Sequence, residues 1–436
     1  MSHQNYRNWG TFMEAELALL QDLGYNLDRR DFYGFSIYRN NLDSENDNPF
    51  FARENGRYVT GKPNTSPWGI GLHIYGSENK VTQTADLLAD GFSGIGVRVD
   101  GSENTLTIDS DTKITANGEY GHGILFSYGK GQNLVLRGTV EASGDHGKAV
   151  AFDFGDNMLS NRTEYRGSYI RANIDEETND WEKNELLPEL EGELITGADI
   201  TGAVTGSDAA VYIGPSAYVK NINIMKGASI NGDIVSDWKP VTDQAIITHA
   251  NPEMLMTTLI FGDAPDENGV HTGNADAAFD ATVKGNISGR ESVDMKVSGG
   301  KLAVTGNIKV HSLETAESTV LSLTMTDAAK TGAVVLADTI DIGGTLTYSF
   351  DPLLHGLDTG DVLTVLNAEN SLTLTQTSED FSLDSIFDYY TFNSVYDQNE
   401  NTLRLKVSSV QSKSAGVQSS YGMTASVISA VGNKIM

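Results

Sequence analysis

GLHIYGSEN at residues 71–79 and GVRVDGSEN at residues 96–104 share a glycine start, an alternating apolar run and a closing Gly-Ser-Glu-Asn. The pattern returns as GILFSYGKGQN at 123–133 and AVAFDFGDN at 149–157, and AVYIGPSAYV at 210–219 is a weaker copy. The first four copies begin at residues 71, 96, 123 and 149, so they are 25, 27 and 26 residues apart. In each copy the second and fourth residues are apolar, which predicts a strand with one buried face.

Each of the first units also contains two further short apolar runs and then a turn rich in small residues, such as DGFSG, NGEYG or SGDHG. Three short strands in about 26 residues cannot bury their apolar face alone, but stacked copies bury it together. The sequence therefore predicts an all-β parallel β-helix with three short strands per rung. The blades of a β-propeller need four strands and about 40 residues, which this spacing excludes.

Asparagines close the first strand of successive units, and stacking would place them at one corner of the coil. Asparagine tolerates the left-handed backbone of a sharp turn, and its amide bonds to the amide above it. The predicted ladder consists of Asn79, Asn104, Asn133 and Asn157.

The remaining segments predict the domain organisation. WGTFMEAELALLQDLGY at residues 9–25 predicts a short helix, since Thr11 and Glu14 form a capping box and leucines form an apolar stripe. We expect an N-terminal helical and irregular cap over 1–65 and a β-helix over 66–330. A C-terminal β cap over 331–408 and a small-residue tail over 409–436 would follow.

An acidic stretch, NIDEETNDWEKNELLPELEGE at 173–193, interrupts the repeat and predicts a loop inserted over 157–193. A loop projecting from a rigid scaffold is a common place for binding groups, although a solvated insertion without function is the alternative. The candidate binding residues are Trp181, Asp175, Glu176, Glu177 and Asp180.

The composition of the chain limits the classes of partner and indicates its cellular compartment. The 436-residue chain has 59 acidic and 30 basic residues and a formal net charge of −29, which excludes nucleic acid as an expected partner. It contains no cysteine, as suits a protein that must not form disulfides before it crosses an outer membrane. Residues 1–25 lack the apolar core of a signal peptide, so an exported protein of this kind would be part of a longer precursor.

The coil, the stretch GDVLTVLNAE at 360–369 and the small-residue tail together resemble the passenger domain of a type V autotransporter of Gram-negative bacteria. The resemblance implies a right-handed β-helix, an autochaperone-like cap at 331–408 and a linker at 409–436 leading to an outer-membrane β-barrel translocator. It also implies a virulence-related location at the cell surface or outside the cell.

The N-terminal segment, MSHQNYRNW followed by MEAELALLQDLGY, resembles the end of a metzincin-type zinc protease domain. The chain contains no His-Glu-x-x-His, and its eight histidines show no metal-ligand spacing. A catalytic domain of this type would therefore lie upstream.

The sequence contains candidate catalytic and metal-binding residues, but none of them forms an established motif. His73, Arg98, Asp100 and Asp153 fall on outward offsets and could line a catalytic groove, although solvated surface is the alternative. The acidic stretches DSENDN at 43–48 and 173–182 are candidate calcium-binding sites. Neither matches the spacing of a known calcium loop. We otherwise expect no cofactor.

The sequence favours a non-catalytic adhesin or host-interaction protein that binds a host or bacterial surface protein or a glycan. The alternative is a surface enzyme, either a glycan-active β-helix or the remainder of a zinc protease.

Overall fold

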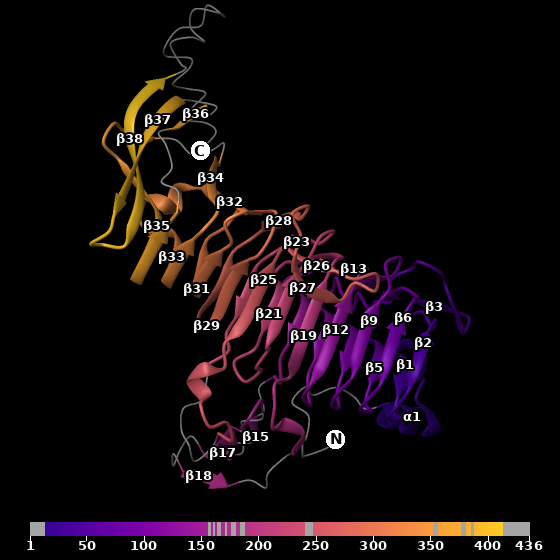
Figure 1. Ribbon diagram of the computed structural model, residues 1–436. Coiled ribbons are helices and arrows are strands. Elements are labelled where there is room, and N and C mark those ends of the chain that lie inside the picture. The colour runs from indigo at the N-terminus through magenta and orange to yellow at the C-terminus, as the bar shows by residue number, and fades with distance from the viewer. Residues whose placement is uncertain are drawn as a thin grey trace, which may run out of the picture.

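The structure is a computed structural model in which the strands stack into one long coil (Figure 1). The predicted parallel β-helix is confirmed, and the helix predicted near the N-terminus is present as α1 (Glu14–Asp22). The structure describes residues 14–155, 158–159, 162–163, 167–170, 172–175, 180–183, 188–239, 247–351, 356–375, 381–384 and 388–412.

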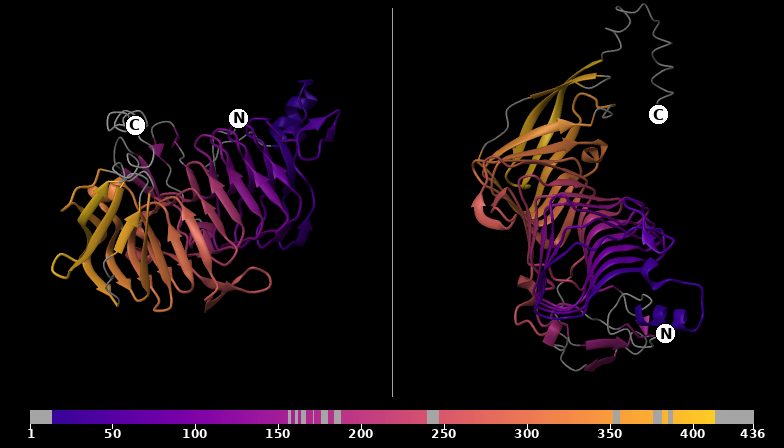
Figure 2. Two further views of the ribbon diagram at one scale, coloured as in Figure 1. Left: turned by 90° about the horizontal axis from the view of Figure 1, so that it is seen from above. Right: turned by 90° about the vertical axis from the view of Figure 1, so that its right-hand side faces the viewer.

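Three columns of parallel strands form the first part of the coil, and Figure 2 (right) shows them from the end that carries α1. The first column consists of β1 (Tyr33–Ile37), β5 (Ile70–Ile74), β8 (Ile95–Val99), β11 (His122–Phe126), β14 (Lys148–Phe152), β21 (Ala209–Ile213) and β24 (Ile234–Ser236). The second consists of β2 (Asp43–Asn46), β6 (Lys80–Gln83), β9 (Thr105–Ile108), β12 (Gln132–Leu136), β19 (Ile195–Ile200), β22 (Asn221–Ile224) and β25 (Thr257–Phe261). The third consists of β7 (Leu87–Leu88), β10 (Lys113–Thr115), β13 (Thr139–Ala142), β20 (Ala203–Gly206), β23 (Ser229–Asn231), β28 (Asp280–Lys284), β30 (Lys301–Val304), β32 (Val320–Met325) and β34 (Thr345–Phe350).

Farther along the coil, the first and second columns merge. β29 (Ile287–Val297) pairs with β24 near its start and with β25 near its end, so one long strand passes through both positions. Three more long strands stack on it in parallel, namely β31 (Ile308–Thr315), β33 (Ala333–Ile342) and β35 (Val362–Leu374).

Equivalent apolar side chains form ladders inside the coil, as the repeat predicts. The register aligns Leu72 with Val97, Val97 with Ile124, and Ile124 with Val150. All four side chains are fully buried in one continuous core that also includes residues of the last strands. The stacked rungs therefore bury together the face that no single rung covers.

The glycines that open the repeats are required by close packing. A Cβ at Gly96 would overlap Cγ2 of Ile114 in the third column and the carbonyl oxygen of Gly123 on the next rung. A Cβ at Gly123 would likewise overlap Val140. The first and third columns approach each other too closely here for any side chain.

The coil begins earlier than residue 66, the start predicted from the sequence. β1 and β2 already pair in parallel with β5 and β6, and so they form a first rung within the expected cap over 1–65. Their sequences, YGFSI and DSEN, lack the aliphatic alternation of later rungs, which concealed the rung. η1 (Arg29–Asp31) and a hairpin of β3 (Arg53–Glu54) and β4 (Arg57–Tyr58) accompany this rung.

The predicted apolar stripe of α1 is only partly buried. Leu17 packs with Ile70, Ile95 and Leu125 on the outer face of the first column, whereas Leu19 and Leu23 are exposed. The helix thus lies against the outside of the coil.

Parallel pairing also continues past residue 330, the predicted end of the coil. β33, β34 and β35 stack in register on the preceding rungs, and antiparallel pairing begins only where β38 (Thr402–Ser412) joins β35. β36 (Phe381–Asp384) and β37 (Asp388–Asp397) complete this antiparallel end. Tyr390, Phe392 and Leu405 are buried there, so this end closes the core with aromatic and aliphatic side chains.

The remaining described elements lie outside the columns. They are η2 (Pro188–Leu190), η3 (Pro252–Met254), η4 (Asp327–Lys330), the hairpin of β26 (Asp263–Pro265) and β27 (His271–Ala275), and β15 (Met158–Leu159), β16 (Arg162–Thr163), β17 (Ala172–Asp175) and β18 (Asp180–Lys183). Within the described part of the chain, no helix combines the length and apolar character needed to span a bilayer.

Candidate functional site

The residues expected to line an outer catalytic groove instead form a buried polar cluster. The Asp100 carboxylate bonds His73 through Nε2 at 2.7 Å, and it accepts hydrogen bonds from Arg98 Nε at 3.2 Å and from the Ser127 hydroxyl at 2.5 Å. All four residues are buried. Asp153 lies on the next rung beyond Ser127 and accepts a hydrogen bond from the Gly155 amide at 2.9 Å.

Burial overturns both interpretations of this set, since it is neither an open groove nor solvated surface. The ring of Tyr75 stacks on His73 with centroids 3.5 Å apart, and Tyr38 stacks on Tyr75 at 4.7 Å. Because the buried Asp100 carboxylate has an arginine, a histidine and a hydroxyl as partners, the cluster satisfies its charge internally. The cluster therefore holds the outer face of the first rungs together rather than facing a substrate.

The inserted segment forms a small antiparallel sheet away from the coil axis (Figure 1). β17 and β18 pair so that Ile174 lies opposite Trp181 and Asp175 opposite Asp180. Glu176 and Glu177 lie outside the described residues. The binding role predicted for this segment therefore stays a prediction.

The corner predicted to carry an asparagine ladder contains two of the expected residues. Asn104 Oδ1 accepts a hydrogen bond from the Asn79 amide at 2.9 Å, and Asn104 Nδ2 donates to Gln132 Oε1 at 3.1 Å. Gln132 rather than Asn133 thus occupies the third position, because the strand register pairs Asn133 with Thr105, the residue after Asn104. Asn157 lies outside the described residues.

Four rings project from another corner, where the third column turns into the first. Trp68 meets Phe92 edge-on with centroids 6.3 Å apart, and Phe92 meets Tyr120 edge-on at 5.9 Å. Tyr120 stacks on His146 at 4.7 Å with the ring planes 13° apart. We call these four residues the aromatic corner. Trp68, Phe92 and Tyr120 are 41%, 44% and 43% exposed, so the row faces solvent.

The backbone at this corner is strained. Trp68, Tyr120 and His146 each have φ of 56°, and Ser93 has φ of 49°. This left-handed conformation suits glycine and costs a residue with a Cβ about 1–2 kcal/mol. Bulky aromatic residues at such positions are uncommon. Glu78 and Glu103 at the asparagine corner have the same conformation, with φ of 60° and 58°, so the rings and not the backbone distinguish the aromatic corner.

Bonds between rungs hold the strained residues in place. The Trp68 amide donates to the Phe92 carbonyl, the Ser93 amide to the Glu119 carbonyl and the Tyr120 amide to the Asp145 carbonyl, each at 2.8 Å. Because every turn is tied to the turn above, the rings keep a fixed spacing along the coil.

The residues that precede two of the rings are acidic. Glu119 and Asp145 are exposed, and each immediately precedes a ring of the aromatic corner in the chain. The Asp145 carboxylate lies 3.8 Å from the His146 ring nitrogen Nε2. The corner thus combines apolar ring surface with groups that accept hydrogen bonds when they are ionised.

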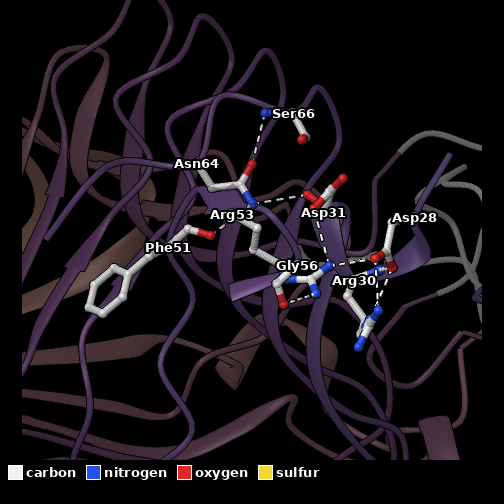
Figure 3. Close-up of polar contacts among 8 residues, drawn as sticks. All are labelled: Asp28, Arg30, Asp31, Phe51, Arg53, Gly56, Asn64 and Ser66. Carbon is white, nitrogen blue, oxygen red and sulfur yellow. Dashed lines mark hydrogen bonds and ion pairs between the residues drawn. The ribbon is translucent and has the colours of Figure 1, made fainter. Parts of the chain in front are cut away.

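A polar network anchors the chain near the start of the aromatic corner (Figure 3). The Asp28 carboxylate bonds Arg30 at 2.9 Å and the buried Arg53 guanidinium at 2.7 Å. The hydrogen bonds from Arg30 and then Arg53 hold the pKa of Asp28 far below its ordinary value of 3.8, although burial acts to raise it. Asp28 therefore stays ionised across the neutral and mildly acidic range.

The same network reaches the turn that carries Trp68. Asn64 Nδ2 donates to the Asp31 carbonyl at 2.9 Å, and Asn64 Oδ1 accepts from the Ser66 amide at 2.9 Å (Figure 3). The Gly69 amide then donates to the Ser66 carbonyl at 3.3 Å. Trp68 is therefore held between a fixed turn and the first strand of its rung.

The reasoning from sequence did not single out the aromatic corner. The signal was present, because the turns DGFSG, NGEYG and SGDHG each place a ring one or two residues before a glycine. Only the structure shows that these rings stack and are exposed. Within the described ranges, no group of three His, Asp or Glu side chains is arranged to hold a metal ion.

The sequence matches no known protein-family model, and comparisons with curated proteins and with solved structures find no match.

Proposed function

We propose that this chain is the passenger part of an autotransporter, displayed outside a Gram-negative cell, and that it acts as an adhesin or host-interaction protein. The single observation that carries a binding role is the aromatic corner, where three exposed rings and a histidine form one row on a rigid scaffold. Exposed aromatic surface held in a fixed row is typical of an interaction site.

Three further features support the proposal. A stacked coil closed by an antiparallel end, formed by β35 with β36–β38, is the architecture that the autotransporter resemblance implies. The net charge of −29 disfavours nucleic acid and anionic lipid as partners. In this proposal the partners are a host or bacterial surface molecule and the chain's own outer-membrane translocator barrel.

Adherence of bacteria that display the chain tests this function. The chain is fused to an unrelated translocator barrel, and adherence to cultured epithelial cells and sedimentation through self-aggregation are measured beside cells that display the barrel alone. We expect the chain to raise at least one of these readouts several-fold. We expect the double variant Phe92→Ser/Tyr120→Gly to remove most of that gain.

Tyr25→Ser is the matched control, because Tyr25 is an exposed ring outside the aromatic corner. Surface display of each variant is checked by antibody binding to intact cells. If displayed chain raises neither adherence nor aggregation, the proposed function is wrong. If the double variant and Tyr25→Ser behave alike, the aromatic corner is not the binding site.

A further inference from the structure

We propose that the ligand of the aromatic corner is an extended glycan that carries no acidic groups. This inference rests on the proposed function and names the class of partner that the site takes. It is carried by the spacing of the rings, the chemistry of the groups beside them and the charge of the chain.

The spacing favours a polymer with a short repeat. Neighbouring rungs are ~4.8 Å apart, and one ring projects from each of four successive turns, at Trp68, Phe92, Tyr120 and His146. A pyranose ring with its glycosidic oxygen spans a distance of the same order as one rung. The ring centroids lie 6.3, 5.9 and 4.7 Å apart. An extended peptide, with side chains on one face every ~6.6 Å, also fits this range, so the groups beside the rings decide between the two polymers.

The groups at the corner match the two faces of a sugar. The C–H face of a pyranose is apolar and packs on exposed rings such as those of Trp68 and Phe92. Its hydroxyl groups are donors. The exposed Asp145 carboxylate, 3.8 Å from the His146 ring, is an acceptor beside the row, and the exposed Glu119 adjoins Tyr120 in the chain. A row of rings with acceptors at the same corner therefore suits a chain of sugars bound along the coil axis.

The charge of the protein excludes acidic sugars. A chain with net charge −29 and carboxylates at the site repels uronic acids and sulfated glycans. Neutral sugars avoid this repulsion, and amino sugars with free ammonium groups gain attraction from Glu119 and Asp145.

Titration of the whole chain with defined hexasaccharides tests the ligand class. The probes are cellohexaose, N-acetylated chitohexaose and deacetylated chitohexaose, with hexagalacturonate as the acidic arm and hexalysine as the peptide arm. Binding is measured by calorimetry and by the change in tryptophan fluorescence. We expect at least one of the first three probes to bind and hexagalacturonate not to bind.

Variants assign the binding to the corner. Phe92→Ser/Tyr120→Gly should weaken binding of the sugar at least tenfold, whereas Tyr25→Ser should leave it within twofold of the unmodified chain. Far-ultraviolet circular dichroism and thermal melting confirm that both variants are folded. If the double variant fails this check, Phe92→Ser alone is used and should weaken binding at least threefold.

Several outcomes would overturn the inference: none of the three sugars binds, binding does not depend on the aromatic corner, or hexalysine binds in their place. If adherence of displaying cells depends on the corner while no sugar binds, only the ligand class is wrong. If displaying cells neither adhere nor aggregate, the failure belongs to the proposed function itself.

Discussion

Strain at the aromatic corner predicts an unusual order of stabilities at Tyr120. Its φ of 56° costs a residue with a Cβ about 1–2 kcal/mol, and this cost is present with tyrosine and with alanine but not with glycine. Glycine in turn widens the unfolded ensemble by about 0.4–1 kcal/mol. Tyr120→Gly should therefore be more stable than Tyr120→Ala by roughly 1 kcal/mol, the reverse of the usual order.

Both variants also lose the ring contacts to Phe92 and His146, which at this exposed site contribute about 1 kcal/mol together. Tyr120→Ala should thus be destabilised by roughly 1 kcal/mol, while Tyr120→Gly should lie close to the unmodified chain. Ser93 provides the matched control, because it has φ of 49° at the same corner position without a ring. Ser93→Gly should stabilise the chain by roughly 1 kcal/mol, whereas Ser93→Ala should not.

Equilibrium unfolding in urea, followed by circular dichroism, measures these differences through the transition midpoints at unchanged slope. For 436 residues unfolding together, 1 kcal/mol corresponds to about 1 °C in the melting temperature, so replicate measurements are needed to resolve it. If alanine equals or exceeds glycine in stability at both Tyr120 and Ser93, the backbone at this corner is not strained.

Three further perturbations test other parts of the structure. Phe152→Ala removes a fully buried ring of the inner ladder and should cost about 3–5 kcal/mol by urea unfolding, whereas a loss under 1 kcal/mol would contradict a packed core. Burial and the neighbouring Lys148 lower the pKa of His122 from 6.5 to about 4. As the pH falls, the unfolded chain therefore takes up the proton first, and the free energy of unfolding should fall by roughly 3 kcal/mol between pH 6.5 and 4. His122→Gln should reduce this pH dependence, and the same dependence in the variant and the unmodified chain would refute the assignment to His122. Deleting residues 331–436 removes the strands that pair with β31 and β32, so the remainder should aggregate or lose cooperative melting, and a shortened chain that melts like the whole protein would argue against a closing role for this end.

The inner ladder could be predicted from the sequence because burial inside a coil leaves a local, periodic signal. Leu72, Val97 and Ile124 recur at the same offset, and the register aligns them as expected. Such a pattern needs no knowledge of distant segments, since each rung packs against its nearest neighbours.

The boundaries and the ladder positions were harder to predict, because pairing does not depend on apolar alternation alone. β1 and β2 form a rung with polar and aromatic sequences, and β34 continues the third column within the segment predicted to be a separate C-terminal cap. Gln132 and not Asn133 holds the ladder position, since the strand register, rather than the residue type, places its side chain against Asn104.

The outer face could not be predicted because its environment is set by contacts remote in sequence. Arg98 and Asp100 alternate with valines as solvated strand residues do, yet both are buried. Conversely, Phe92 and Tyr120 occur in glycine-rich turns of a kind that usually carries no large exposed group, yet they are exposed and aligned. Tertiary contacts therefore determine that this outer face is covered and that this corner is exposed.

The candidate site lies at a corner because the core and the outer face of the first column are already packed. Inward side chains fill the core, and the outer face of the first column is occupied around His73 and Leu125. A corner is then the place where a side chain can project freely and recur at every rung. The same hydrogen bonds that stack one turn on the next hold Trp68 and Tyr120 in a conformation that an isolated turn would not maintain. The scaffold therefore sets both the spacing of the rings and their rigidity, and a ligand that matches this spacing meets a row of rings that needs little reorganisation on binding.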